Sequence, residues 1–68
     1  MDNDFGKNLK CLRLEKSLSQ MQVAKLIGVS QQCISEWENS KIEPTLTSLW
    51  RLADVFDISI DELIGRSK

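Results

Sequence analysis

The amino-acid sequence predicts an all-α fold, a compact bundle of five short helices. Hydrophobic residues recur at helical spacing along the chain, and no segment shows the strict alternation of apolar and polar residues that is typical of strands. Capping residues precede these helical patterns, and glycine or proline stands between some of them. Together these observations favour helices as the regular structure of the chain.

Length and hydropathy place the chain among small globular domains. With 68 residues, 41% of them hydrophobic, we expect one domain over 1–68. A core of this size gains stability from a partner subunit, which favours a homodimer. Apolar runs are short and the opening MDNDFGK is acidic, so the sequence predicts neither a membrane span nor a signal peptide.

The first predicted helix covers about 4–16, with Asp4 or Asn3 available as its cap. Its inward stripe consists of Phe5, Leu9, Leu12, Arg13 and Lys16. A charge among apolar residues needs a partner, because the desolvation penalty of a buried ion is several kcal/mol. Glu38 lies on the inward face of the third predicted helix, so we expect a salt bridge between Arg13 and Glu38.

Capping signals mark the remaining helices. The capping box SQMQ at 19–22 opens a second helix, and Gly28 ends it because glycine readily takes the left-handed conformation. Ser30 caps a third helix over about 31–38.

A fourth and a fifth helix follow the loop that ends at Pro44. Thr45 caps the fourth. Its repeating hydrophobic residues, expected on the inward face, are Leu46, Leu49, Leu52, Ala53 and Phe56. A second capping box, SIDE at 59–62, opens a short fifth helix that includes Leu63 and Ile64.

Residue sets for catalysis or metal binding are missing from the sequence. There is no histidine, and Cys11 and Cys33 lack the CxxC spacing of a zinc site. Asp61 and Glu62 are adjacent on a helix and therefore point apart. We expect a protein without enzymatic activity, cofactor, metal or small-molecule ligand, whose cysteines are free thiols in a reducing cytoplasm.

The second and third predicted helices, joined by a short turn, fit a helix-turn-helix unit. Such a unit needs a small residue where its helices cross, glycine in the turn, and hydrophobic residues toward the bundle. The residues in these roles are Val23, Ala24, Ile27, Gly28, Val29, Ile34 and Trp37.

The stretch SQMQVAKLIGVSQQCISEWENSKIEPTLTSLWRLADVFDISIDELI resembles the Cro and lambda-repressor type of helix-turn-helix domain. The family pattern runs close to LTQxxLAxxxGVSxxxISxWExGxxxPxxxxLxxLAxxLxVSxDxLL, and the resemblance extends over 5–64. It implies a lambda-repressor-like domain, prokaryotic or phage-encoded, that binds operator DNA as a two-fold dimer and regulates transcription. It also implies the pairing of Arg13 with Glu38. Three positions where the family favours glycine carry Ser17, Ser40 and Asp57, which predicts either a small stability cost or an altered loop shape.

Helical angle assigns one face of the third helix to the DNA major groove. With Ile34 at the centre of the inner face, Gln32 and Glu36 lie nearly opposite. Glutamine can pair bidentately with adenine, and glutamate can accept from cytosine. The predicted base contacts are Gln31, Gln32, Ser35 and Glu36. An ordinary solvated helix face is the alternative, and Cys33 at its edge is a candidate redox switch.

Phosphate contacts are predicted at the ends of these helices. Gln20 stands at the start of the second helix, where free backbone N–H groups favour an anion. The predicted contacts after the third helix are Asn39, Ser40 and Lys41. Lys41 is alternatively a solvated loop charge, and the carboxylates of Glu36 and Glu43 oppose DNA binding.

Trp50 lies at the edge of the apolar stripe of the fourth helix, where core packing and a dimer contact are both open. With Ile58 it forms the candidate dimer interface. The rival function is a helical protein-interaction module, which the acidic pI of 5.2 favours. The sequence leaves open whether the chain is a phage repressor, a restriction-modification controller, an antitoxin or a chromosomal regulator.

Overall fold

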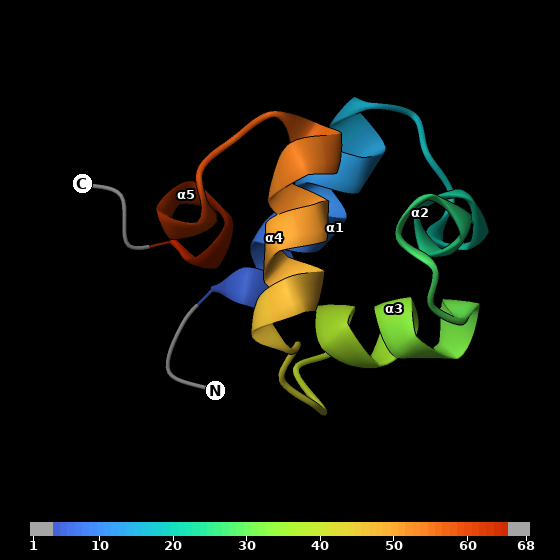
Figure 1. The fold of residues 1–68 in the computed structure, drawn as a ribbon. Coiled ribbons are helices and arrows are strands. Elements are labelled where there is room, and N and C mark those ends of the chain that lie inside the picture. Colours follow the sequence, from blue (N-terminus) through green and yellow to red (C-terminus); the bar gives the residue numbers. More distant parts are fainter. Residues whose placement is uncertain (1–3, 66–68) are drawn as a thin grey trace.

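This computed structural model describes residues 4–65, which contain five α-helices (Figure 1). In chain order they are α1 (Phe5–Glu15), α2 (Gln20–Ile27), α3 (Gln31–Glu38), α4 (Leu46–Phe56) and α5 (Ile60–Ile64). The prediction of an all-α, five-helix fold is confirmed. Over these residues no helix combines the length and the apolar character needed to cross a membrane.

Side-chain caps begin four of these helices, as the sequence predicts. In each case a hydroxyl group accepts a hydrogen bond from the backbone N–H three residues later, and the four residues are Ser19, Ser30, Thr45 and Ser59. The capping boxes of α2 and α5 are complete, because Gln22 and Glu62 accept from the N–H of the capping serine. Each cap contributes about 1 kcal/mol, which is a large share of the stability of so short a helix.

The start of α1 differs from the prediction. Asp4 occupies the cap position, but its side chain makes no capping hydrogen bond, and Asn3 lies outside the described residues. The φ of −97° and ψ of 23° at Asp4 lack the extended geometry that places a cap side chain over the first turn. Lys16 was expected on the inward stripe and is instead exposed, because α1 ends at Glu15 and the chain turns there.

The core lies where the five helices meet. α1 packs on α3 and α5, α2 packs on α3 and α4, and α4 packs on α5. The buried hydrophobic cluster consists of Phe5, Leu9, Val23, Ala24, Ile27, Ile34, Trp37, Leu52, Phe56 and Leu63. Within it the rings of Phe5 and Trp37 meet edge to face, with centroids 6.1 Å apart.

The prediction that Leu46 faces inward is wrong. Its side chain is 72% exposed. The buried residues of α4 are Leu52, Ala53 and Phe56, all in its second half. The helix therefore extends past the core at its start, where periodicity alone cannot distinguish a covered turn from an uncovered one.

Gly6 allows α1 to approach the end of α3 closely. A Cβ atom at this position would lie 2.5 Å from the carbonyl oxygen of Trp37 and 2.9 Å from that of Glu38. Both neighbours are backbone atoms, so a side chain at Gly6 would separate the two helices.

Three non-glycine residues have positive φ, and they stand at the positions where the family pattern favours glycine, so the loops keep their shape. Ser17, Ser40 and Asp57 have φ values of 56°, 57° and 54°, each just after a helix. L-residues are disfavoured in this region by about 1–2 kcal/mol. Gly28, at φ 78°, takes the same conformation in the turn between α2 and α3 without that cost.

Candidate nucleic-acid interface

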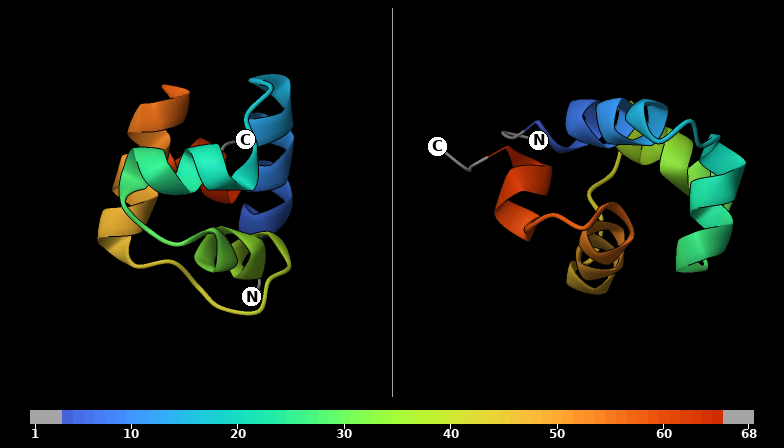
Figure 2. Two further views of the ribbon diagram at one scale, coloured as in Figure 1. Left: turned by 90° about the vertical axis from the view of Figure 1, so that its right-hand side faces the viewer. Right: turned by 90° about the horizontal axis from the view of Figure 1, so that it is seen from above.

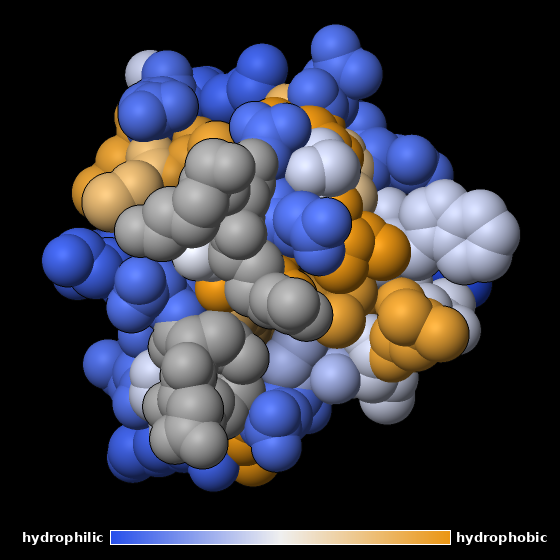
Figure 3. Space-filling view, turned by 90° about the vertical axis from the view of Figure 1, so that its left-hand side faces the viewer, coloured by the Kyte–Doolittle hydropathy of each residue, from blue (hydrophilic) through white to orange (hydrophobic). Residues whose placement is uncertain are grey.

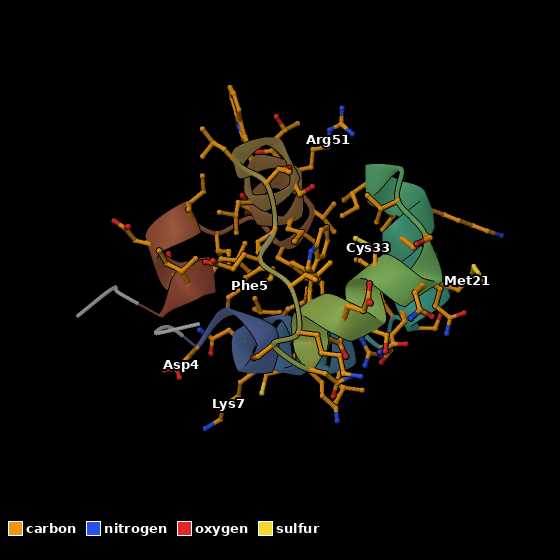
Figure 4. All side chains as sticks on the ribbon, turned by 90° about the horizontal axis from the view of Figure 1, so that it is seen from below. Asp4, Phe5, Lys7, Met21, Cys33 and Arg51 are labelled. Carbon is orange, nitrogen blue, oxygen red and sulfur yellow. The ribbon has the colours of Figure 1, made fainter. Side chains whose placement is uncertain are left out.

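α3 directs an apolar face into the core and a polar face outward. Ile34 and Trp37 are buried on the inner face. The predicted base contacts stand on the remaining surface, the first two exposed and the last two half-buried: Gln31, Gln32, Ser35 and Glu36. Amide, hydroxyl and carboxylate groups are among the side-chain groups that hydrogen-bond base edges in the major groove. Figure 4 shows α3 from below, with α2 beside it.

The predicted ion pair between Arg13 and Glu38 is present and buried. Nε of Arg13 lies 2.7 Å from Oε2 of Glu38, and the two side chains are 10% and 3% exposed. Nη2 of Arg13 also donates to Oε1 at 3.1 Å, so the contact is bidentate. The hydrogen bond to Glu38 raises the pKa of Arg13, although burial acts in the opposite direction. The pair links α1 to the last residue of α3.

Gln20 extends this pair toward the outward face. Its Nε2 donates to Oε1 of Glu38 at 3.1 Å, and its Oε1 accepts from Nε2 of Gln31 at 3.5 Å. One of the two N–H bonds of the Gln20 amide is thus used within the protein, which leaves the other as a donor for phosphate. The structure thus joins the first residues of α2 and α3 to a buried carboxylate, which the sequence pattern did not reveal.

The three residues after α3 differ in how free their side chains are to contact DNA. Nδ2 of Asn39 donates to the carbonyl of Ser35 at 2.8 Å, so this amide folds back over the end of α3. Ser40 is exposed in the left-handed conformation. The Lys41 side chain is exposed, while its backbone N–H donates to the carbonyl of Glu36 at 2.9 Å. Of the three predicted phosphate contacts here, Lys41 offers the cation.

Local charge around α3 is mixed. Glu36 and Glu43 stand close in sequence to Lys41, so no basic patch forms from this segment. Burial, and to a lesser extent the negative charge of Glu36, raises the pKa of the Cys33 thiol. A neutral, half-buried thiol is a poor nucleophile, which disfavours a redox switch at Cys33.

The two candidate dimer residues are not equally accessible. The Trp50 side chain is 65% exposed, so core packing does not explain it. Ile58 is half-buried and packs against the core cluster. Figure 3 shows exposed hydrophobic atoms on the side of the molecule that carries α4 and α5. Elsewhere on the surface, Leu14, Met21 and Leu26 are also exposed.

Comparisons with known proteins find a family and several structures. The sequence profile of the helix-turn-helix family matches residues 9–63. The transcriptional activator BcrR of Enterococcus faecalis is 39% identical over 62 residues, which are 91% of this chain and 30% of BcrR. The chain thus spans less than a third of that relative.

Two solved structures are similar along most of their length. The P22 c2 repressor bound to a synthetic operator superposes with a TM-score of 0.87 and 30% identity, over 93% of this chain and 96% of that one. The restriction-modification controller C.AhdI of Aeromonas hydrophila has a TM-score of 0.82 and 33% identity, over 88% and 91%.

Proposed function

The chain belongs to the Cro and lambda-repressor type of the helix-turn-helix family of DNA-binding transcription regulators, and we propose that it recognises a palindromic operator as a homodimer. The supporting observation is the polar face of α3. It carries amide, hydroxyl and carboxylate groups, while the opposite face is fixed to the core and to the buried pair of Arg13 with Glu38. A recognition helix needs both properties, because its side chains read bases only if the helix is held in place.

In this proposal α3 enters the major groove and two sets of residues divide the contacts. The residues assigned to base edges are Gln31, Gln32, Ser35 and Glu36. The residues assigned to the phosphate backbone are Gln20, Asn39, Ser40 and Lys41. For Gln20, the second N–H of its amide and the free backbone N–H groups at the start of α2 supply the donors. For Asn39, the amide must turn away from the Ser35 carbonyl to reach a phosphate, because the backbone N–H of Asn39 already donates to that carbonyl.

The proposed dimer uses the exposed side of α4, with Trp50 at its centre and Ile58, which follows α4, as a second contact. A large exposed indole next to half-buried aliphatic residues is the composition of an interface core. We propose that the dimer acts in the cytoplasm as a repressor, by occupying an operator that overlaps a promoter.

A protein-interaction module that keeps the fold without binding DNA is the second candidate. It is favoured by the acidic pI of 5.2 and by the carboxylates of Glu36 and Glu43 near α3. A partner protein would then cover the polar face of α3 in place of DNA.

Selection from a random duplex library at low salt, followed by footprinting, separates these functions. We expect a two-fold site whose half-sites lie about 34 Å apart, one turn of B-DNA. Failure to enrich any sequence would favour the interaction module. Enrichment of a single, unsymmetrical half-site would retain DNA binding and exclude the dimer.

Glu36 provides a sharper test on the selected operator. If its carboxylate accepts from a cytosine, Glu36→Ala lowers affinity and relaxes the preference at one base pair of each half-site. If it only repels phosphate, the same variant binds all sequences more tightly. Competition against single-base operator variants distinguishes the two, and we expect the first result.

A further inference from the structure

Two arginines, one on α1 and one on α4, hold α2 at its opposite ends. At the first end, Arg13 of α1 binds Glu38, which in turn accepts from Gln20, the first residue of α2. At the other end, Nη1 of Arg51 on α4 donates to the carbonyl oxygen of Ile27, the last residue of α2, at 3.1 Å. Figure 2 shows α2 spanning the space between α1 and α4, with α3 below it.

Arg51 contacts α2 at its C-terminal end. The last carbonyl groups of a helix have no intrahelical partner, and a cation there complements the negative end of the helix dipole. Ile27 is followed by Gly28, whose left-handed φ of 78° turns the chain toward α3. Arg51 therefore fixes the backbone immediately before the turn of the helix-turn-helix unit.

Arg51 lies away from the residues assigned to DNA. Those residues belong to α3, to the loop after it and to the first position of α2. Arg51 instead contacts the last residue of α2, about 10 Å from the first along the helix axis. Figure 4 shows Arg51 on the α4 side of the molecule, next to α2. The principal contact of α4 with this unit is through α2.

We propose that Arg51 is a positioning residue for DNA recognition, which sets the direction of α3 by anchoring the C-terminal end of α2 to α4. The proposal rests on the proposed function of sequence-specific DNA binding. It assigns Arg51 an effect on the discrimination between operator and random DNA, which a side chain that contacts only phosphate would not have.

The test compares Arg51→Met with Lys10→Met in binding to the selected operator and to random duplex DNA. Methionine keeps an unbranched apolar stem and removes the guanidinium. Lys10→Met removes the same charge from an exposed position on α1, outside the α2–α3 unit. All proteins are assayed at a temperature at which urea titration shows them to be folded, and the salt dependence of binding is measured for each.

We expect Arg51→Met to bind the operator about three- to tenfold more weakly, with affinity for random DNA and the log-log salt slope equal to those of Lys10→Met. Amide hydrogen exchange at Gly28 and Val29 should be faster in Arg51→Met alone. Equal losses on operator and random DNA, with a salt slope reduced by about one unit, would identify a phosphate contact and overturn the proposal. Unchanged operator affinity in the folded variant would show that Arg51 only stabilises the fold, and would also overturn the proposal. If the unaltered protein selects no operator, it is the proposed function that fails.

Discussion

At the residue scale, Glu38 accepts hydrogen bonds from Nε and Nη2 of Arg13 and from Nε2 of Gln20. Removing the arginine leaves a buried carboxylate with only a neutral amide as partner. We therefore expect Arg13→Ala to lower the free energy of unfolding by about 3 kcal/mol, measured by urea titration. Lys10→Ala, at an exposed position of the same helix, is the control. A loss below about 0.5 kcal/mol, the range of exposed pairs, would contradict the burial of this pair.

Substitutions of Gln32 and Lys41 should change DNA binding in different ways if the first contacts bases and the second contacts phosphate. Lys41→Ala should weaken binding to every sequence alike and reduce the salt slope by about one unit, because it removes a phosphate contact. Gln32→Ala should cost about 1–3 kcal/mol on the preferred operator and relax one base pair of each half-site. Competition binding on a panel of operator variants measures both. An unchanged preference profile in Gln32→Ala would show that another face of α3 meets the bases.

Single-residue patterns predicted some of these contacts and missed others. The Arg13–Glu38 pair was predictable, because two charges on inward faces of apolar stripes require each other. The bonds from Gln20 to Glu38 and from Arg51 to Ile27 were not predictable, since a polar residue outside the apolar stripes has many possible partners. Spacing along the chain gives no information about which helix end lies opposite such a residue.

At the scale of helices, Gly6 determines how closely α1 and α3 can pack. Alanine normally stabilises a helix interior relative to glycine by about 1 kcal/mol. Here the added methyl would collide with two backbone carbonyl groups of α3, so Gly6→Ala should instead destabilise the protein by about 1–3 kcal/mol. Thermal and urea unfolding measure the sign. A gain in stability would show that α1 shifts without cost.

The left-handed residue after α1 offers the opposite effect. Ser17→Gly should raise the free energy of unfolding by about 0.5–1 kcal/mol, because the relief of the strained φ exceeds the entropy that glycine adds to the unfolded chain. Lys16→Gly is the matched control, since Lys16 has a φ of −92° and gains nothing from glycine. Equal stability changes in the two variants would show that the left-handed conformation carries no cost at Ser17.

Helix positions were largely predictable because caps and periodicity are local signals. The hydroxyl residues before α2, α3, α4 and α5 determine where each begins. Asp4 is at the cap position without a capping hydrogen bond, and Leu46 is exposed, since cap geometry and core coverage depend on the neighbouring helices. Gly6 went unnoticed, although a glycine among the inward residues of a helix is itself a sign of close packing.

For the molecule as a whole, Trp50 is the residue on which the proposed dimer depends most. Trp50→Ala should weaken dimerisation by about 2 kcal/mol, because truncating a central tryptophan removes a large buried apolar area. Sedimentation measures the association, and thermal unfolding checks that the monomer remains folded. Leu14→Ala, at another exposed hydrophobic position, is the control. An association constant unchanged in Trp50→Ala would move the interface elsewhere.

The two tryptophans occupy opposite environments, and this has a spectroscopic consequence. Trp37 is 3% exposed and lies against Phe5, whereas Trp50 projects into solvent. A buried indole emits at shorter wavelength and is shielded from a soluble quencher such as iodide, while an exposed indole is quenched readily. Fluorescence from the unmodified chain therefore contains two separable signals: loss of the shielded component reports unfolding, and protection of the quenchable component reports that another molecule has covered α4.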